Sequence, residues 1–216
     1  MQPTPATTAP VIERRFTTGA VELRAAGDNA RPMVRGYAAV FGKSSDNLGG
    51  PYYQVFEIIE PGAFDDVLKD DVRALFNHDA NLILARSKNG TGTLTLGVDQ
   101  TGLFYEFESP DTTAGRDLQV SLARGDVDQS SFAFSITQDG QKWQEVTEAG
   151  VTVATRTIKK VSRLYDVSPV TYPAYPDASA ALRSLDQHRQ AAPVAQASTS
   201  FPITGAQAAR LGLSIT

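Results

Sequence analysis

The chain has 216 residues, of which 41% are hydrophobic, 8% aromatic and 20% charged; it contains no cysteine and carries a net charge of −4. This length and composition fit one domain with tails and exclude wholesale disorder, and the lack of cysteine excludes disulfide bonds, thiolate metal sites and a cysteine nucleophile. The acidic balance argues against a nucleic acid partner, and no apolar run is long enough to predict a membrane span.

Composition divides the chain into three expected parts. Residues 1–32 begin with Pro, Thr and Ala almost throughout, which predicts a flexible N-terminal arm. Residues 33–180 carry a net charge of −7 and alternate short apolar runs with Gly, Pro and Asp, as expected for the folded domain. Residues 181–216 are rich in Ala and Gln and predict a flexible C-terminal tail.

Within the central region, the apolar runs predict mostly strands. In chain order, the expected strands cover residues 34–41, 55–59, 72–76, 94–98, 103–107, 127–136, 151–158 and 161–171. The segments 94–98 and 103–107 alternate around a turn, which predicts a β-hairpin. Helices are expected over residues 63–70 and over residues 112–124, the latter capped by Asp111 and ended by Gly125. These elements indicate an α+β fold built on a mostly antiparallel sheet or barrel.

His78 is the first candidate for chemistry, because it follows an apolar strand at a boundary with a loop. Scaffolds often present functional groups at such positions, although a partly buried or surface histidine is the plain alternative. The other histidine, His188, lies in the expected tail. One histidine and no cysteine leave only carboxylates as further ligands, so we expect no metal.

Ser131 and Asp166 are the other candidates. Strand alternation places Ser130 with Phe132 and Phe134 on the core face, and Ser131 among small residues on the opposite face, where a substrate can reach it. Asp166 is a lone carboxylate in an apolar strand, where a charge usually has a partner. An ordinary solvent-facing strand and a surface carboxylate are the alternatives. Serine, histidine and carboxylate together are the parts of an activated-serine hydrolase.

An ordered series of motifs spans residues 34–178. It comprises Gly36-Tyr37-Ala38-Ala39-Val40-Phe41, Glu60-Pro61-Gly62-Ala63-Phe64, Leu75-Phe76-Asn77-His78-Asp79, Gly102-Leu103, Ser131-Phe132-Ala133-Phe134, Asp166-Val167-Ser168-Pro169-Val170 and Pro173-Ala174-Tyr175-Pro176. With this series the chain resembles the prohead (capsid-maturation) protease family of tailed bacteriophages, which is similar in fold to the herpesvirus protease assemblin. The resemblance implies a mostly antiparallel β-barrel of about seven strands with a few flanking helices. It also implies a serine endopeptidase that cleaves capsid and scaffold proteins during head maturation.

The resemblance gives a role to each candidate residue. Ser131 matches the family's nucleophile and His78 its histidine, and Asp166 falls at the usual acidic position, where the herpesvirus relatives have a second histidine. Ala133 and Ala85 replace residues that are commonly glycine in the family, and both are small. The resemblance implies no cofactor, the major capsid protein and scaffold segments as partners, a homo-oligomer, and action in the host cytoplasm inside the assembling prohead.

Two other functions stay open at this point. The chain could be a catalytically inactive capsid-assembly scaffold protein of the same fold, or a hydrolase that uses the same residues on a non-protein ester. The donors for a transition-state oxyanion are unassigned, with the backbone N–H groups beside Ser131 and the Arg163 side chain as candidates. Proteases of the family commonly process themselves, and Ala197-Ser198 in the expected tail offers small residues for such a cut.

Overall fold

The computed structural model describes residues 11–17, 21–24, 31–172 and 178–191. Its strands in the N-terminal half are β1 (Glu13–Thr17), β2 (Glu22–Arg24), β3 (Met33–Val40), β4 (Tyr53–Ile59), β5 (Val72–Leu75), β6 (Ile83–Lys88), β7 (Thr91–Gly92), β8 (Leu94–Val98) and β9 (Gly102–Glu108). The remaining elements are α1 (Thr113–Arg124), β10 (Gln129–Ser135), the short 3₁₀ helix η1 (Gln138–Gly140), β11 (Gln141–Glu148), β12 (Val151–Ile158), β13 (Arg163–Val170) and α2 (Ala178–Ala191).

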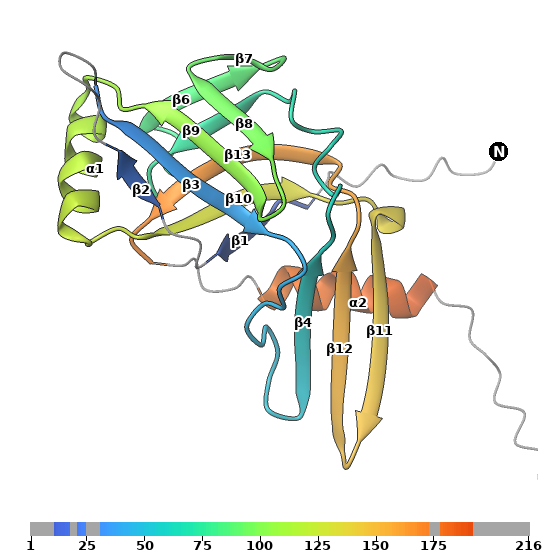
Figure 1. Cartoon of the computed structure of the whole chain (residues 1–216). Helices are drawn as coiled ribbons and strands as arrows, with labels where there is room; N and C mark the ends of the chain where they lie inside the picture. Colours follow the sequence, from blue (N-terminus) through green and yellow to red (C-terminus); the bar gives the residue numbers. More distant parts are fainter. Residues whose placement is uncertain (1–10, 18–20, 25–30, 173–177, 192–216) are drawn as a thin grey trace, which may run out of the picture.

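The strands of the described residues form three open sheets. The largest has the order β1-β10-β13-β5-β6-β7, the second β2-β3-β9-β8 and the third β11-β12-β4. The first two sheets and α1 make up the body of the molecule, and the third sheet projects from it as a long arm beside α2 (Figure 1). Most pairs are antiparallel, but β13 pairs with β5 and β12 with β4 in parallel.

One main core lies between the two sheets of the body. Phe132 and Phe134 of β10 stack on each other with ring centroids 4.8 Å apart, and Phe64 meets Phe132 edge-on at 5.6 Å. Tyr105 and Phe107 of β9 are buried in the same cluster. Burial of these aromatic rings supplies a large part of the hydrophobic stabilisation, and it fixes which face of β10 points inward.

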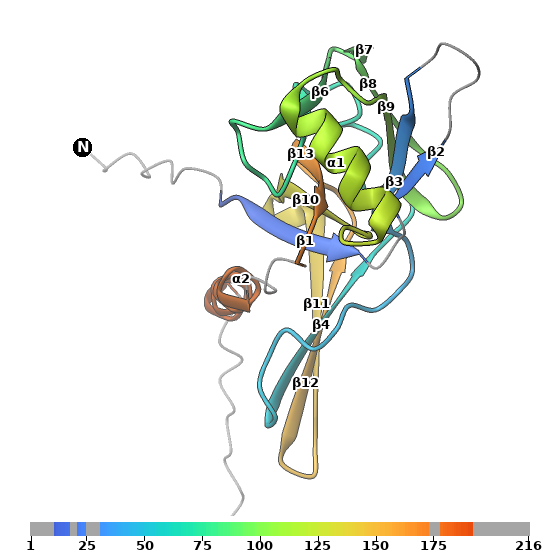
Figure 2. The same cartoon turned by 90° about the vertical axis from the view of Figure 1, so that its left-hand side faces the viewer.

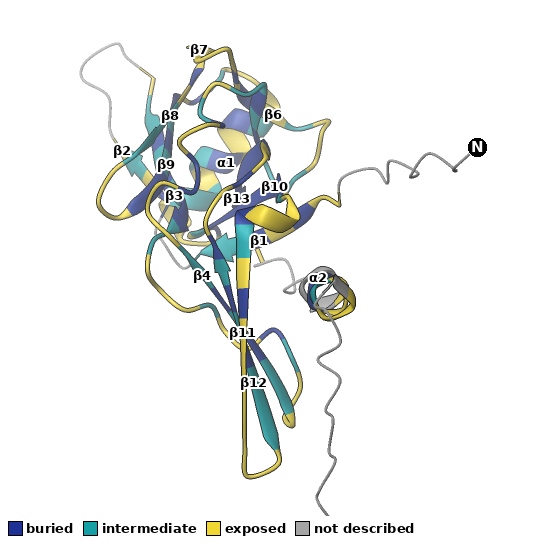
Figure 3. Cartoon of the chain, turned by 90° about the vertical axis from the view of Figure 1, so that its right-hand side faces the viewer, coloured by how far each residue is buried: buried dark blue, intermediate teal, exposed yellow. Residues whose placement is uncertain are grey.

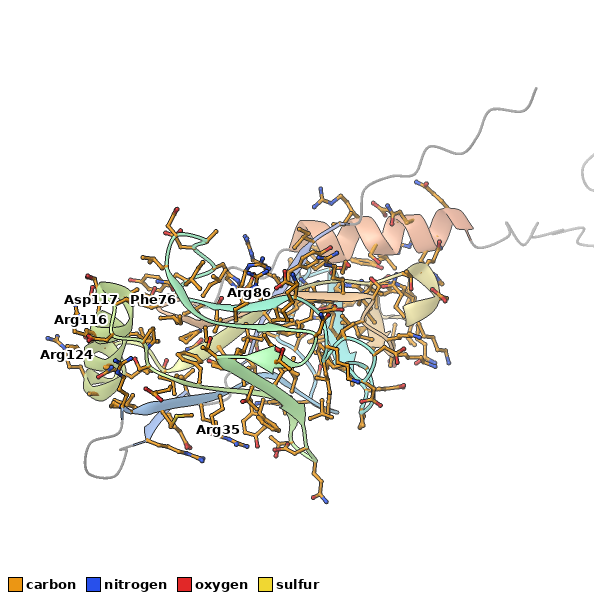
Figure 4. All side chains as sticks on the ribbon, turned by 90° about the horizontal axis from the view of Figure 1, so that it is seen from above. Arg35, Phe76, Arg86, Arg116, Asp117 and Arg124 are labelled. Atoms are coloured by element: carbon orange, nitrogen blue, oxygen red, sulfur yellow. The ribbon has the colours of Figure 1, made fainter. Side chains whose placement is uncertain are left out.

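Helix α1 begins and ends as helix-capping chemistry requires. The Thr112 hydroxyl accepts a hydrogen bond from the Gly115 backbone N–H at 3.1 Å, and Gly125 ends the helix in the left-handed conformation with φ of 78°. Thr112 therefore takes the capping role predicted for Asp111, which instead pairs with Arg116. In Figure 4 the labelled side chains Arg116 and Arg124 of α1 lie at the end of the molecule away from α2.

A second, smaller core joins α2 to the third sheet. Leu185 of α2 is buried against Trp143, Val55 and Ala154, which come from the three strands of that sheet. The tip of the β11–β12 hairpin carries exposed and half-buried residues, whereas buried residues concentrate in the body (Figure 3). The third sheet is therefore anchored at its base and covered on one side by α2.

The comparison with the sequence predictions confirms a mostly β, α+β fold. The expected hairpin is β8–β9, and the expected strand at residues 151–158 is β12. The predicted barrel is not confirmed, since each sheet of the described residues has two open ends in its strand order. The helix predicted over residues 63–70 is a series of turns with i to i+3 backbone bonds, such as Val67 N–H to the Phe64 carbonyl.

Parts of the predicted flexible ends are ordered. Strands β1 and β2 lie within the predicted arm at residues 1–32, and most of α2 lies within the predicted tail at residues 181–216. Strand β1 is held there because its charged side chains Glu13 and Arg15 find buried partners, which composition does not reveal. The Ala197-Ser198 pair lies outside the described residues. No helix among the described residues is long and apolar enough to span a membrane.

Candidate active site

Three neighbouring strands of the largest sheet bring the predicted residues together. Ser131 lies on β10 and Asp166 on the adjacent β13, while His78 follows β5, the next strand along. The register pairs Ser131 with Ser168 and Ala133 with Asp166. Paired residues of antiparallel strands share one face, so Ser131 and Asp166 both project from the face opposite the buried phenylalanines.

The loop after β5 carries His78 in an unusual backbone conformation. Asn77 and His78 have φ values of 56° and 57°, in the left-handed region that residues other than glycine rarely adopt. The Asn77 N–H donates to the Pro169 carbonyl at 3.0 Å, and the Asn77 Oδ1 accepts from the Thr171 N–H at 2.9 Å. Two bonds to the end of β13 therefore hold the strained turn, and they aim the His78 ring at the face of β10.

The three side chains form a continuous hydrogen-bonded chain. His78 Nε2 lies 2.6 Å from Ser131 Oγ, and His78 Nδ1 lies 2.5 Å from Asp166 Oδ1. A carboxylate accepts but does not donate, so Nδ1 must carry a proton and a neutral ring leaves Nε2 free to accept the serine proton. This geometry is what activates a serine hydroxyl, because the carboxylate fixes the tautomer and stabilises the imidazolium that forms.

Ser168 is a fourth member of this arrangement, and the sequence interpretation gave it no role. Its hydroxyl donates to Asp166 Oδ1 at 2.9 Å and also lies 3.3 Å from His78 Nδ1. The Ser168 side chain is fully buried. Because Ser168 and Asp166 are two residues apart on β13, they face the same way, and the hydroxyl holds the carboxylate toward the imidazole.

Other candidates lie elsewhere. Ser130 points into the core, as predicted, and shares a 2.8 Å hydrogen bond with the buried Tyr105 hydroxyl. Burial raises the pKa of Tyr105, so this phenol stays protonated. Arg163 pairs with Ser135, four residues along β10 from Ser131, and its guanidinium stacks on Tyr165, so it does not reach the Ser131 hydroxyl. His188 belongs to α2.

The Ser131 hydroxyl has a second partner that the sequence gave no reason to expect. The Arg15 backbone carbonyl on β1 accepts a hydrogen bond from Ser131 Oγ at 3.0 Å. Ser131 is 0% exposed, and the His78 and Asp166 side chains are 7% and 10% exposed. The triad geometry is therefore complete, but Ser131 is closed to solvent and its hydroxyl is bonded to strand β1.

Comparison with known proteins identifies the family of the chain. The sequence profile of the caudovirus prohead serine proteases matches residues 19–191. The chain belongs to this family. The prohead protease of Enterobacteria phage HK97 is 26% identical over 182 residues, which cover 82% of this chain and 72% of that protein. The solved structure of the bacteriophage T4 capsid assembly protease gp21 aligns over 77% of this chain and 100% of its own, at 12% identity and a TM-score of 0.38.

His78 and Ser131 both fall inside the matched residues, as does Asp166. Strand β1 precedes the matched residues.

Proposed function

We propose that this prohead protease is a serine endopeptidase in which Ser131 is the nucleophile, His78 the general base and then acid, and Asp166 the residue that orients the imidazole. The observation that carries the proposal is the pair of short contacts from His78, 2.6 Å to the serine hydroxyl and 2.5 Å to the carboxylate. An activated serine needs a hydrogen bond from its hydroxyl to a base, and the base needs a third group that orients it; these two contacts supply both.

The proposed reaction has two stages. Ser131 Oγ attacks a peptide carbonyl carbon while His78 Nε2 takes the hydroxyl proton, and the proton then passes to the leaving amine as the C–N bond breaks. Water next gives its proton to His78 and attacks the acyl-enzyme carbonyl carbon, and His78 returns that proton to Ser131 Oγ as the ester bond breaks. In both stages Asp166 stabilises the positive charge on the ring.

The proposed substrates are the major capsid protein and scaffold segments of an assembling phage head. Membership of the prohead serine proteases supports this role, as does the name of the HK97 relative. We also propose action inside the assembling prohead in the host cell, as a homo-oligomer. Self-cleavage at Ala197-Ser198 belongs to the same proposal, because small residues in an extended segment suit a maturation protease.

An inactive assembly scaffold of the same fold is the competing function, and the complete burial of Ser131 is the observation that favours it. The two functions differ in what the Ser131→Ala variant does. Purified wild-type protein should cleave the precursor coat protein of its phage and should lose its C-terminal tail on storage, whereas Ser131→Ala should do neither. Intact mass spectrometry measures both reactions, and equal cleavage by the two proteins would refute the assignment of Ser131.

A further inference from the structure

Strand β1 lies where a substrate strand would have to lie. β10 has two neighbours, and β13 on one side contributes Asp166, so only the side occupied by β1 can receive another extended chain (Figure 2). β1 pairs antiparallel with β10, with Phe16 opposite Ser131. Proteases commonly hold extended peptides by adding them to a sheet edge, because main-chain hydrogen bonds give affinity and alternate side chains give specificity.

The contact between β1 and Ser131 is unproductive. The Arg15 carbonyl presents its oxygen to the Ser131 hydroxyl at 3.0 Å, whereas attack needs the carbonyl carbon. A serine hydroxyl has one proton, so donation to Arg15 competes with donation to His78 Nε2. β1 therefore both covers the hydroxyl and draws away the proton that His78 has to take.

Four buried charges hold β1 in place. The Arg15 guanidinium binds both oxygens of Glu57 on β4, at 2.9 Å from Nη2 to Oε1, with a second bond from Nε. The Glu13 carboxylate binds Arg156 on β12 at 2.6 and 2.8 Å. All four side chains are at most 6% exposed. Glu13 and Arg15 are two residues apart on β1, so their side chains lie on the same face of the sheet, opposite the face that carries Ser131.

This cluster can separate without leaving an unpaired charge. Glu57 and Arg156 are already paired with each other at 2.6 Å, and Glu13 and Arg15 are paired at 2.7 Å. β1 is also an edge strand of five residues, the kind of element that opens most easily. A cavity of about 120 Å³ borders it, lined by Arg15, Phe16 and Thr17 together with Glu57, Ile59 and Phe132 among others, so one side of the strand is not closely packed.

We propose that β1 is an internal pseudosubstrate: it occupies the site where a substrate segment adds to β10, and that site selects an acidic side chain two residues before a basic one. Arg156 would receive the acidic side chain and Glu57 the basic one. The proposal rests on the proposed serine protease function and names the chemistry of its substrate site. Activity then requires that β1 leave.

A variant in which β1 is held less tightly tests the first part of the proposal, that β1 occupies the substrate site. In Glu13→Gln/Arg15→Met, two opposite charges are lost and the Glu57–Arg156 pair is kept. The matched control is Glu22→Gln/Arg24→Met, which removes the same residue types at the same spacing from the exposed pair on β2. The probe is a fluorophosphonate, which forms a bond between Ser131 Oγ and phosphorus, releases fluoride and sends the hydroxyl proton to His78. We expect labelling about tenfold faster in the β1 variant and unchanged in the control.

A disulfide that fixes β1 to β10 gives a second measurement, which does not depend on Glu13→Gln/Arg15→Met. Thr17 and Ser130 are opposite each other in the register, and the chain contains no other cysteine, so Thr17→Cys/Ser130→Cys can form a single disulfide across β1 and β10. The oxidised protein should label more slowly than the wild type, and a reducing agent should restore labelling. Equal labelling of the oxidised and reduced forms overturns the inference.

Two peptides test the charge preference. One copies residues 12–17, and the other exchanges the positions of Glu13 and Arg15 at identical composition. The first should slow labelling of Glu13→Gln/Arg15→Met, and the second should not, because it sets like charges against Arg156 and Glu57. Equal inhibition by both peptides, or by neither, overturns the proposed selectivity. Absence of labelling in every protein, the loosened and reduced forms included, refutes the activated serine instead, and so separates failure of the proposed function from failure of this inference.

Discussion

Replacing Asp166 by asparagine isolates the electrostatic part of the site, because the side chain keeps its shape and loses its charge. Asp166 Oδ1 lies 2.5 Å from His78 Nδ1 and also accepts from Ser168. The asparagine can turn its NH₂ group toward Nδ1, since the Ser168 hydroxyl can rotate to accept as well as donate. The ring proton then moves to Nε2, which faces Ser131 and can no longer take its proton.

The expected loss is large. A triad with this change loses about 10⁴ in turnover, which corresponds to about 5 kcal/mol of transition-state stabilisation. The assay is the rate of fluorophosphonate labelling of Ser131, together with cleavage of the precursor coat protein and thermal unfolding followed by circular dichroism. Both rates should fall while the unfolding temperature changes little, because the carboxylate and the amide have nearly the same volume.

Asp79→Asn is the matched control for this change. Asp79 is next to His78 in the sequence, but its Oδ1 accepts the Asn81 N–H at 2.8 Å, and its side chain is exposed. An asparagine keeps that acceptor, so both rates should match the wild type. A loss of less than tenfold in Asp166→Asn with the fold intact, or an equal loss in Asp79→Asn, would refute the proposed role of Asp166.

Three further outcomes follow from the same contacts. Ser168→Ala removes the donor to Asp166 Oδ1, so the carboxylate is held less firmly toward the imidazole and labelling of Ser131 should slow. Unchanged labelling would leave Ser168 a packing residue only. Ser130→Ala should keep labelling of Ser131 but lower the free energy of unfolding by about 1–3 kcal/mol, because it leaves the buried Tyr105 hydroxyl without this partner. Burial would raise the pKa of Glu57, but the ion pairs to two arginines outweigh it and lower the pKa to about 2. Its contribution of about 3 kcal/mol should therefore be present above pH 4.5 and be lost as the pH falls toward 2, as urea unfolding at several pH values will show; a flat profile would contradict this.

Several elements of the fold were predictable because the local alternation of apolar and polar residues, or a single turn residue, determines them. The alternation in residues 94–98 and 103–107 gave the β8–β9 hairpin, and Gly125 marked the end of α1. The helix expected over residues 63–70 was wrong because turn bonds and packing of Phe64 into the core outweigh a weak propensity. Closure of a sheet depends on which strands pair over long distances, and periodicity does not contain that information.

The candidate site was likewise predictable in part. Alternation on β10 correctly separated Ser130, which faces the core, from Ser131, which faces His78. Ser168 was present in the quoted motif, but only the register shows that it reaches Asp166. The polar run Glu13-Arg14-Arg15 looked like a solvated arm, since its buried partners Glu57 and Arg156 lie far away in the sequence.

The strand order β10-β13-β5 has a consequence for the time at which the enzyme becomes competent. Its three key residues are spread over 89 positions of the chain, from His78 to Asp166, and the last of them lies on the strand that joins the other two. A ribosome-bound chain that has not yet exposed β13 has no orienting carboxylate and no bridge between β5 and β10. The proposed triad is therefore complete only late in synthesis, after most of the chain has emerged.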